Sequence, residues 1–112
     1  MDNAVLLFTR NGIGDGPVEL HQRLAVKFLS LPADSSVRPA KTLFYTDGVK
    51  LAGNGSPALD PLRALDAQGV ELILCQTCLD YYGLQDQVAA GVVGGMPDII
   101  EAMRMATKVI AL

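Results

Sequence analysis

Apolar runs alternate with amphipathic stretches along this chain, as in proteins built from strands and helices in turn. Apolar runs at residues 4–8, 42–45, 70–74 and 109–112 predict short strands. The run at residues 4–8 is uninterrupted, as expected for a strand covered on both faces, and the strand at residues 70–74 is expected to be buried. A shorter run at residues 92–93 predicts one more strand. Polar or glycine-rich segments separate the runs, so each strand is expected to connect to the next through a loop or a helix.

Three stretches between the runs have the spacing of amphipathic helices. Pro17 suits the first turn of the first helix, and Ser56 suits the N-cap of the second. The apolar residues expected on the buried faces of the three helices are Leu20, Leu24, Phe28 and Leu31, then Leu59, Leu62 and Leu65, and finally Ile99, Ile100 and Met103. Residues 51–55 are expected to form a flexible loop, and residues 85–90 to extend a helix.

The order of these elements determines the expected fold class. Strands that alternate with helices at this spacing form βαβ units, with a mainly parallel sheet and helices on both of its faces. The chain contains no internal repeat and no linker long enough to divide it. We therefore expect a single three-layer α/β/α domain over residues 1–112, with a sheet of about five strands.

Composition narrows the classes of function. Half of the 112 residues are apolar, 19% are charged, and the net charge is −3 with a sequence pI near 4.9. The basic residues are scattered, which argues against a nucleic-acid surface. No apolar stretch approaches the roughly 18 residues of a membrane span, and residues 1–3 lack the basic start of a signal peptide. A cytoplasmic protein with neither a membrane nor a nucleic-acid partner is expected.

Both cysteines of the chain lie in one short motif, Cys75-Gln76-Thr77-Cys78. The motif follows the apolar run at residues 70–74 and precedes a segment that predicts a turn and a helix. A thiol at such a junction meets unpaired backbone N–H groups and the positive end of the helix dipole. These surroundings favour the thiolate and can lower a cysteine pKa to roughly 3.5–7.5. The motif therefore indicates sulfur chemistry.

The two cysteines are expected to differ in role. Cys75 lies at the strand end, where a nucleophile is usually presented, and Cys78 follows about one helical turn later. Attack of Cys78 on a persulfide held by Cys75 would release sulfide and leave a disulfide. The alternative is that both thiols pack as small apolar groups.

The loops that follow the strands are expected to meet at one edge of the sheet, because functional loops of open α/β sheets gather beyond the carboxyl strand ends. These loops make Gly12, Asp15, Lys50 and Tyr82 the candidates for a substrate pocket beside the cysteines. Lys50 would stabilise the charge of a Cys75 thiolate there, although a lysine is equally at home in solvent. Tyr82 either shapes a pocket mouth or an interface, or packs as an ordinary amphipathic ring.

Other interpretations of these motifs fit less well. A zinc site needs two further ligands, but His21 is the only histidine and lies far from the cysteines in sequence, so no metal or cofactor is expected. A thioredoxin motif normally follows an early strand, whereas two strand–helix units precede this motif. The glycines Gly12, Gly14 and Gly16 depart from the G-x-G-x-x-G pattern of nucleotide sites, since Pro17 occupies the position of the third glycine.

Three segments of the chain resemble the DsrE/DsrF-like family, in particular its branch found as the C-terminal domain of YedF-type sulfurtransferase-like proteins. The segments are residues 43–52, residues 55–57 and residues 75–84, of which the last is the most specific. The loop at residues 12–15 is also similar to the first loop of that branch.

This resemblance implies a parallel α/β/α fold, assembly into homo- or hetero-oligomers, and a cysteine that carries persulfide sulfur between proteins. The relay cysteine of the family ends a strand and lies eight residues before a glycine, a spacing that Cys75 and Gly83 match. Cys78 belongs only to the YedF-like branch. YedF-type proteins also carry a TusA-like domain that this sequence does not contain, so a TusA-like or other sulfur-carrier protein is expected to act in trans.

Three functions are compatible with these observations. The first is a sulfur carrier or sulfurtransferase-like protein that uses Cys75, with Cys78 as its resolving thiol and a homo-oligomer as the expected assembly. The second is a dithiol redox protein or sensor that uses the same pair. The third is a non-catalytic interaction domain, in which the oligomer itself is the functional unit.

Overall fold

A single sheet of parallel strands organises the protein. The computed structural model describes residues 3–33 and 37–112. The sheet has five parallel strands in the order β4-β3-β2-β1-β5. The strands are β1 (Ala4–Phe8), β2 (Lys41–Phe44), β3 (Glu71–Cys75), β4 (Val92–Gly94) and β5 (Lys108–Ala111). The fold class expected from the sequence is confirmed.

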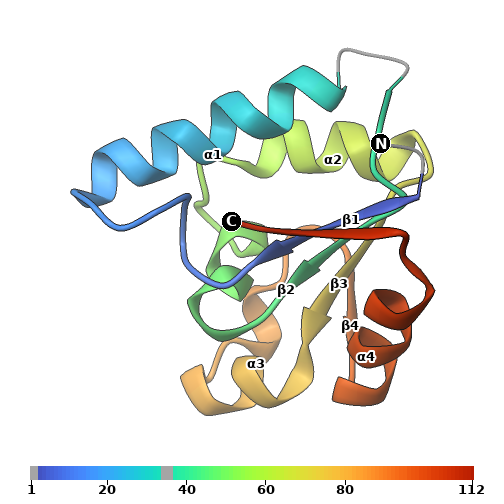
Figure 1. The fold of residues 1–112 in the computed structure, drawn as a ribbon. Helices are drawn as coiled ribbons and strands as arrows, with labels where there is room; N and C mark the ends of the chain where they lie inside the picture. Colours follow the sequence, from blue (N-terminus) through green and yellow to red (C-terminus); the bar gives the residue numbers. More distant parts are fainter. Residues whose placement is uncertain (1–2, 34–36) are drawn as a thin grey trace.

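Helices lie on both sides of the sheet (Figure 1). The α-helices are α1 (Val18–Ala33), α2 (Leu59–Ala67), α3 (Gln76–Tyr82) and α4 (Met96–Met105), and the 3-10 helices are η1 (Thr46–Ala52) and η2 (Gln85–Gln87). Helices α1 and α2 pack against each other above the sheet in this view, whereas α4 lies below it. The short helix α3 contacts both η1 and η2, and all three follow the carboxyl ends of β2 and β3.

The continuous apolar run of β1 has a simple structural cause. All five residues of β1 are buried, since the strand lies between β2 and β5 and is covered from both faces. Its last residue, Phe8, stacks on Phe44 of β2 with ring centroids 5.7 Å apart. These two rings fill the core directly beneath the turn in which η1 begins.

Helix α1 presents to the core a different face from the one the sequence predicts. Ala25 and Leu29 are fully buried, whereas Leu20, Leu24 and Leu31 are 51%, 44% and 66% exposed. The apolar stripe exists, but periodicity alone does not say whether the chain's own sheet covers it. In the described structure Leu20, Leu24 and Leu31 are left at the surface, whereas Phe28, the fourth residue of the predicted stripe, is partly buried against the core.

The segment after β2 is also more ordered than expected. Leu51 and Ala52 are fully buried in η1, and Gly53 forms an antiparallel bridge with Val88, so residues 51–55 are not a flexible loop. The bridge explains why the helical segment expected at residues 85–90 is only the short η2. Both differences arise from packing between segments far apart in sequence.

Candidate functional site

The cysteine pair lies where β3 ends and α3 begins. Cys75 is the last residue of β3 and is fully buried, whereas Cys78 lies in the first turn of α3 and is partly exposed. Both are free thiols. The Cys75 thiol is close enough to Cys78 to help raise the pKa of the Cys78 thiol. The two sulfurs therefore lie close together, with that of Cys75 buried and that of Cys78 nearer the surface.

Helix α3 turns its functional side chains toward η1. Cys78 and Tyr82 are four residues apart and so lie on one face of the helix. The backbone N–H of Thr46 donates a hydrogen bond to Sγ of Cys78, with an N···S distance of 3.0 Å. The Tyr82 hydroxyl donates to Oδ1 of Asp47. The first two residues of η1 thus contact both side chains on this face.

Thr46 has a strained backbone. Its φ of 53° is in the left-handed region, and no other non-glycine residue in the described part of the chain has a positive φ. A β-branched residue is a genuine outlier there, and such conformations cost of the order of 1–3 kcal/mol unless the surroundings hold them. The conformation places the Thr46 N–H against the Cys78 sulfur.

Asp47, Lys50 and Tyr82 form a charged cluster beside the thiols. Nζ of Lys50 lies 3.3 Å from Oδ1 of Asp47 and 4.5 Å from the centroid of the Tyr82 ring. The hydrogen bond to Asp47 raises the pKa of Tyr82 to about 12. The Tyr82 hydrogen bond, with a smaller contribution from Lys50, lowers the pKa of Asp47. The charge of Lys50 therefore acts on Asp47.

The Cys78 thiol is less acidic than a free cysteine. Burial raises its pKa, the N–H of Thr46 opposes this change, and Cys75 and Asp47 add to the increase. For this thiol the direction is opposite to the lowered pKa that the sequence predicts. Desolvation outweighs the favourable N–H donor, so Cys78 is mostly protonated at neutral pH and is correspondingly less open to oxidation.

Two of the four predicted pocket residues, Lys50 and Tyr82, lie in this cluster with Asp47. The other two make their contacts in the first loop. A Cβ at Gly12 would lie 2.5 Å from the ring of His21, so Gly12 allows the loop to pack closely on α1.

Asp15 forms an ion pair with Arg10 at 3.1 Å, and its side chain is 91% exposed. The same loop is joined to α1 by the hydrogen bond from the Ile13 N–H to the carbonyl of His21, 2.9 Å long. The ion pair of Asp15 therefore lies within the first loop and does not involve the residues around the thiols.

Sequence reasoning did not select Thr46 and Asp47 as site residues. Thr46 contributes a backbone group, which no pattern of side chains reveals. Asp47 had a usable signal, because it follows the end of β2 by three residues and lies in the same loop as Lys50.

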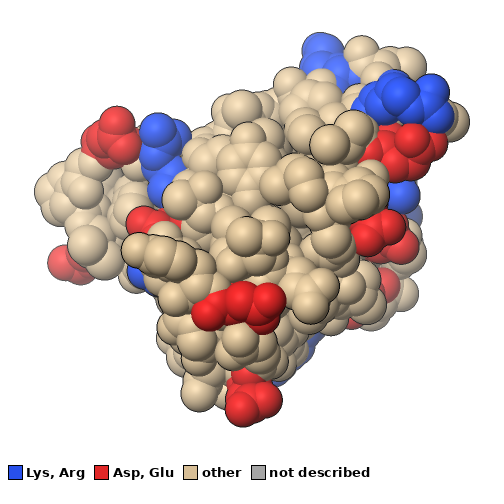
Figure 2. Space-filling model, turned by 90° about the horizontal axis from the view of Figure 1, so that it is seen from below, with Lys and Arg blue, Asp and Glu red and all other residues tan. Residues whose placement is uncertain are grey.

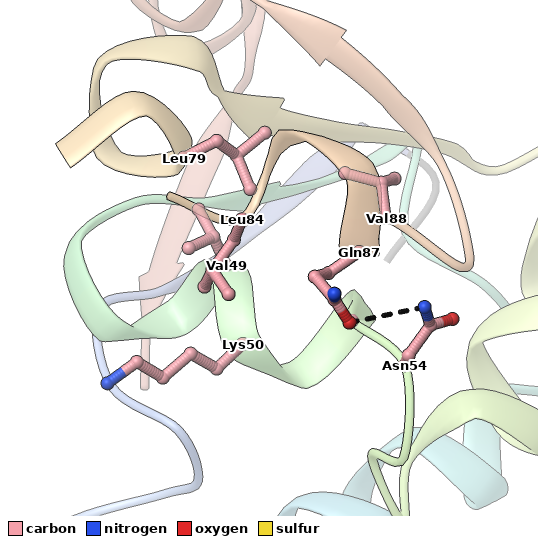
Figure 3. Close-up of a pocket in the computed structure, with 8 residues that line it drawn as sticks. Val49, Lys50, Asn54, Leu79, Leu84, Gln87 and Val88 are labelled. Atoms are coloured by element: carbon pink, nitrogen blue, oxygen red, sulfur yellow. Dashed lines mark hydrogen bonds between the residues drawn. The ribbon is translucent and has the colours of Figure 1, made fainter. Parts of the chain in front are cut away.

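A small cavity adjoins the cysteine site (Figure 3). Its volume is about 110 Å³. Its apolar lining comes from η1, α3 and the segment around η2, and consists of Val49, Leu79, Leu84 and Val88. Asn54 donates a hydrogen bond of 3.3 Å to Gln87 at its edge, and the Lys50 side chain extends away from the apolar residues. The cavity is thus mainly apolar, and Leu79 in its lining directly follows Cys78 in α3.

Charge is sparse on the face that Figure 2 shows. Uncharged side chains occupy most of it, acidic groups lie in its lower middle and around its margin, and the few basic groups lie toward its upper edges. Within residues 3–33 and 37–112, no group of three or more His, Cys, Asp or Glu side chains is arranged to hold a metal ion. The described helices also include none that is long and apolar enough to span a membrane.

The fold and the site define a class: a parallel α/β domain with a pair of free thiols at the carboxyl edge of its sheet. The chain belongs to the DsrE/DsrF-like family, whose profile matches residues 25–112. A search of curated proteins gives no match.

Two solved structures have a similar fold. The ychN protein from E. coli superposes with a TM-score of 0.70 at 21% sequence identity, with all of both chains covered. The protein of unknown function MTH1491 from Methanobacterium thermoautotrophicum superposes with a TM-score of 0.66 at 21% identity, covering 99% of this chain and 100% of that one. At this level of identity, both comparisons bear on the fold alone.

Proposed function

We propose that this protein is a sulfur carrier, which passes persulfide sulfur through the Cys75–Cys78 pair to and from another protein. The observation that carries the proposal is the pairing of a buried thiol with a partly exposed one at the carboxyl edge of the sheet. Membership of the DsrE/DsrF-like family fits a sulfur-relay role in general. A thiol relay needs a compartment in which thiols stay reduced, so the cytoplasm is its proposed location.

The two thiols suit different parts of this task. A persulfide exchanges its sulfur with any thiolate that reaches it. Cys75 has no exposed surface, so sulfur held there is sheltered from small thiols in solution. Cys78 is the neighbour that can resolve such a persulfide. The other protein in the exchange is a TusA-like or other sulfur carrier that acts in trans.

Sulfur loading tests the proposal. After incubation with the persulfide form of a cysteine desulfurase, the wild type is expected to gain one sulfur atom in its intact mass, which a thiol reductant removes. The variant in which both cysteines are replaced (Cys75→Ala with Cys78→Ser) should gain none. Equal gain in that variant, or no gain in the wild type, would contradict the proposal.

A dithiol redox role is the second candidate, and the same contact between the thiols favours it. In that case the persulfide donor leaves the mass unchanged, and a mild oxidant removes a pair of hydrogens by forming a Cys75–Cys78 disulfide. Intact mass therefore separates the two functions in one experiment. An interaction domain with no thiol chemistry would respond to neither reagent.

We also propose that the protein acts as a homo-oligomer, with the exposed stripe of α1 in the interface. Leu20, Leu24 and Leu31 are each more than 40% exposed, and a shallow apolar groove between Leu24, Phe28 and Leu31 continues the stripe. Contiguous apolar surface of this kind is typical of protein–protein contacts.

Charge placed in this stripe is expected to dissociate the assembly. Leu24→Lys buries an unpaired ammonium in the interface, which weakens association by several kcal/mol. Sedimentation velocity should show a smaller species for this variant, while Ala67→Lys on the exposed end of α2 sediments like the wild type. Identical sedimentation of Leu24→Lys and the wild type would place the interface elsewhere.

A further inference from the structure

The two cysteines differ most in their access to other molecules. Cys75 is 0% exposed and belongs to the hydrophobic core. Cys78 is partly exposed on the face of α3 that meets η1. A sulfur atom on another protein can approach the partly exposed Cys78, whereas Cys75 has no exposed surface for it to approach.

This difference determines a route for sulfur within the proposed function, on which the inference rests. We infer that Cys78 is the entry thiol: sulfur from the partner's persulfide is transferred first to Cys78 and reaches Cys75 only from there. Cys75 is then the inner, storing thiol, and the same path in reverse delivers sulfur to an acceptor.

The route consists of two exchange steps without net oxidation. In the first, the Cys78 thiolate attacks the outer sulfur of the donor's persulfide; a new S–S bond forms, the donor's S–S bond breaks, and the donor leaves as a thiol with the proton that Cys78 lost. In the second, the Cys75 thiolate attacks the same outer sulfur and displaces Cys78, which takes up the proton released by Cys75. Cys75 then carries the persulfide.

The Thr46 N–H supplies an independent observation in favour of this route. Both steps place negative charge on the Cys78 sulfur, which is the nucleophile in the first step and the leaving group in the second. This backbone donor lies 3.0 Å from the sulfur and belongs to a residue with a φ of 53°. The donor therefore stabilises the Cys78 thiolate that the first step requires and the charge that develops on the leaving Cys78 sulfur in the second step.

The acidity of Cys78 is compatible with this role. Its raised pKa keeps the resting thiol protonated. Once ionised, a thiol of higher pKa is the stronger nucleophile toward a disulfide or persulfide sulfur. The raised pKa thus favours the attack by the Cys78 thiolate in the first step, whereas it slows the departure of Cys78 in the second step, which the N–H of Thr46 assists.

The test compares Cys75→Ser and Cys78→Ser with the wild type during loading by the persulfide form of a cysteine desulfurase, followed by intact mass and by mapping of the modified peptide. Cys75→Ser is expected to accept one sulfur but to hold it on Cys78, where glutathione removes it about tenfold faster than from the wild type. Cys78→Ser is expected to load at least about tenfold more slowly than the wild type.

Controls keep the outcomes distinct. Thr77→Ala changes an exposed residue between the cysteines and should load like the wild type. If a buried serine prevents folding, Cys75→Ala replaces Cys75→Ser. Loading of Cys78→Ser at the wild-type rate, or failure of a folded Cys75 variant to accept sulfur, overturns the entry route while leaving the carrier function intact. No uptake by the wild type overturns the carrier function itself, and the route with it.

Discussion

Replacing Gly48 with alanine is expected to destabilise the protein by about 3 kcal/mol. A Cβ at this position would lie 2.0 Å from the carbonyl oxygen of Phe8 and 2.6 Å from its carbonyl carbon. Both atoms belong to the backbone of the buried strand β1, so no side-chain rotation relieves the clash. Helix η1 must move away from β1, and urea unfolding monitored by circular dichroism would measure the cost.

Gly16→Ala is the matched control for this substitution. A Cβ at Gly16 meets no atom within 4 Å, and the residue is exposed. Its free energy of unfolding should stay within about 0.5 kcal/mol of the wild type. If Gly48→Ala and Gly16→Ala are equally stable, the contact between η1 and β1 is not as close as described. Because Thr46 lies two residues before Gly48, the destabilised variant should also expose Cys78 to faster alkylation.

Replacing Asp47 with alanine is expected to lower the pKa of Tyr82 from about 12 toward its ordinary value of 10.0. The Asp47 carboxylate accepts the phenolic hydrogen bond and opposes ionisation by its charge, so its removal makes the phenol more acidic. Alkaline titration by ultraviolet absorbance measures the change, with Tyr82→Phe identifying the signal of Tyr82. The pKa of Cys78 should also fall, since the charge of Asp47 helps to raise it.

The same pair makes stability depend on pH in a defined direction. Folding raises the pKa of Tyr82 from 10.0 to about 12 and lowers that of Asp47 from its ordinary 3.8. The bond between them therefore contributes fully between these two ordinary values, and it is lost as the pH rises toward 12 or falls far enough to protonate Asp47. Asp47→Ala has no such contribution to lose. Asp86→Ala, which removes an exposed carboxylate in η2, should leave the Tyr82 titration unchanged. An unshifted titration in Asp47→Ala would contradict the described hydrogen bond.

The three inner strands, β1, β2 and β3, could be predicted because burial leaves a direct mark on their composition, whereas the edge strands β4 and β5 are largely exposed. Residues 4–8 are apolar without interruption, and the structure buries all of them between two neighbouring strands. Residues 70–74 predict β3 in the same way, within one residue of its bounds. An apolar run of this length reflects the position of its strand inside the sheet, where neighbouring elements cover both faces.

The faces of the helices were not predictable to the same degree. The spacing of Leu20, Leu24 and Leu31 correctly indicates an amphipathic helix, yet the core takes Ala25 and Leu29 instead. A helix face that binds another chain and a helix face that packs on the sheet of its own chain have the same spacing of apolar residues. The order of Leu51 and Ala52 in η1 also escaped prediction, because it depends on packing against segments distant in sequence.

The sequence by itself determined the parallel α/β class, the position of the thiol pair at the end of β3, and the presence of Lys50 and Tyr82 near it. Residue type and spacing carry that information because strand ends of one sheet share an edge. Only the tertiary structure decided that Cys75 is buried, that Cys78 is partly exposed, and that a strained Thr46 donates its N–H to the outer sulfur. The exposure of a side chain and the direction of a backbone N–H depend on how the whole chain packs, so the type of a residue does not determine either of them.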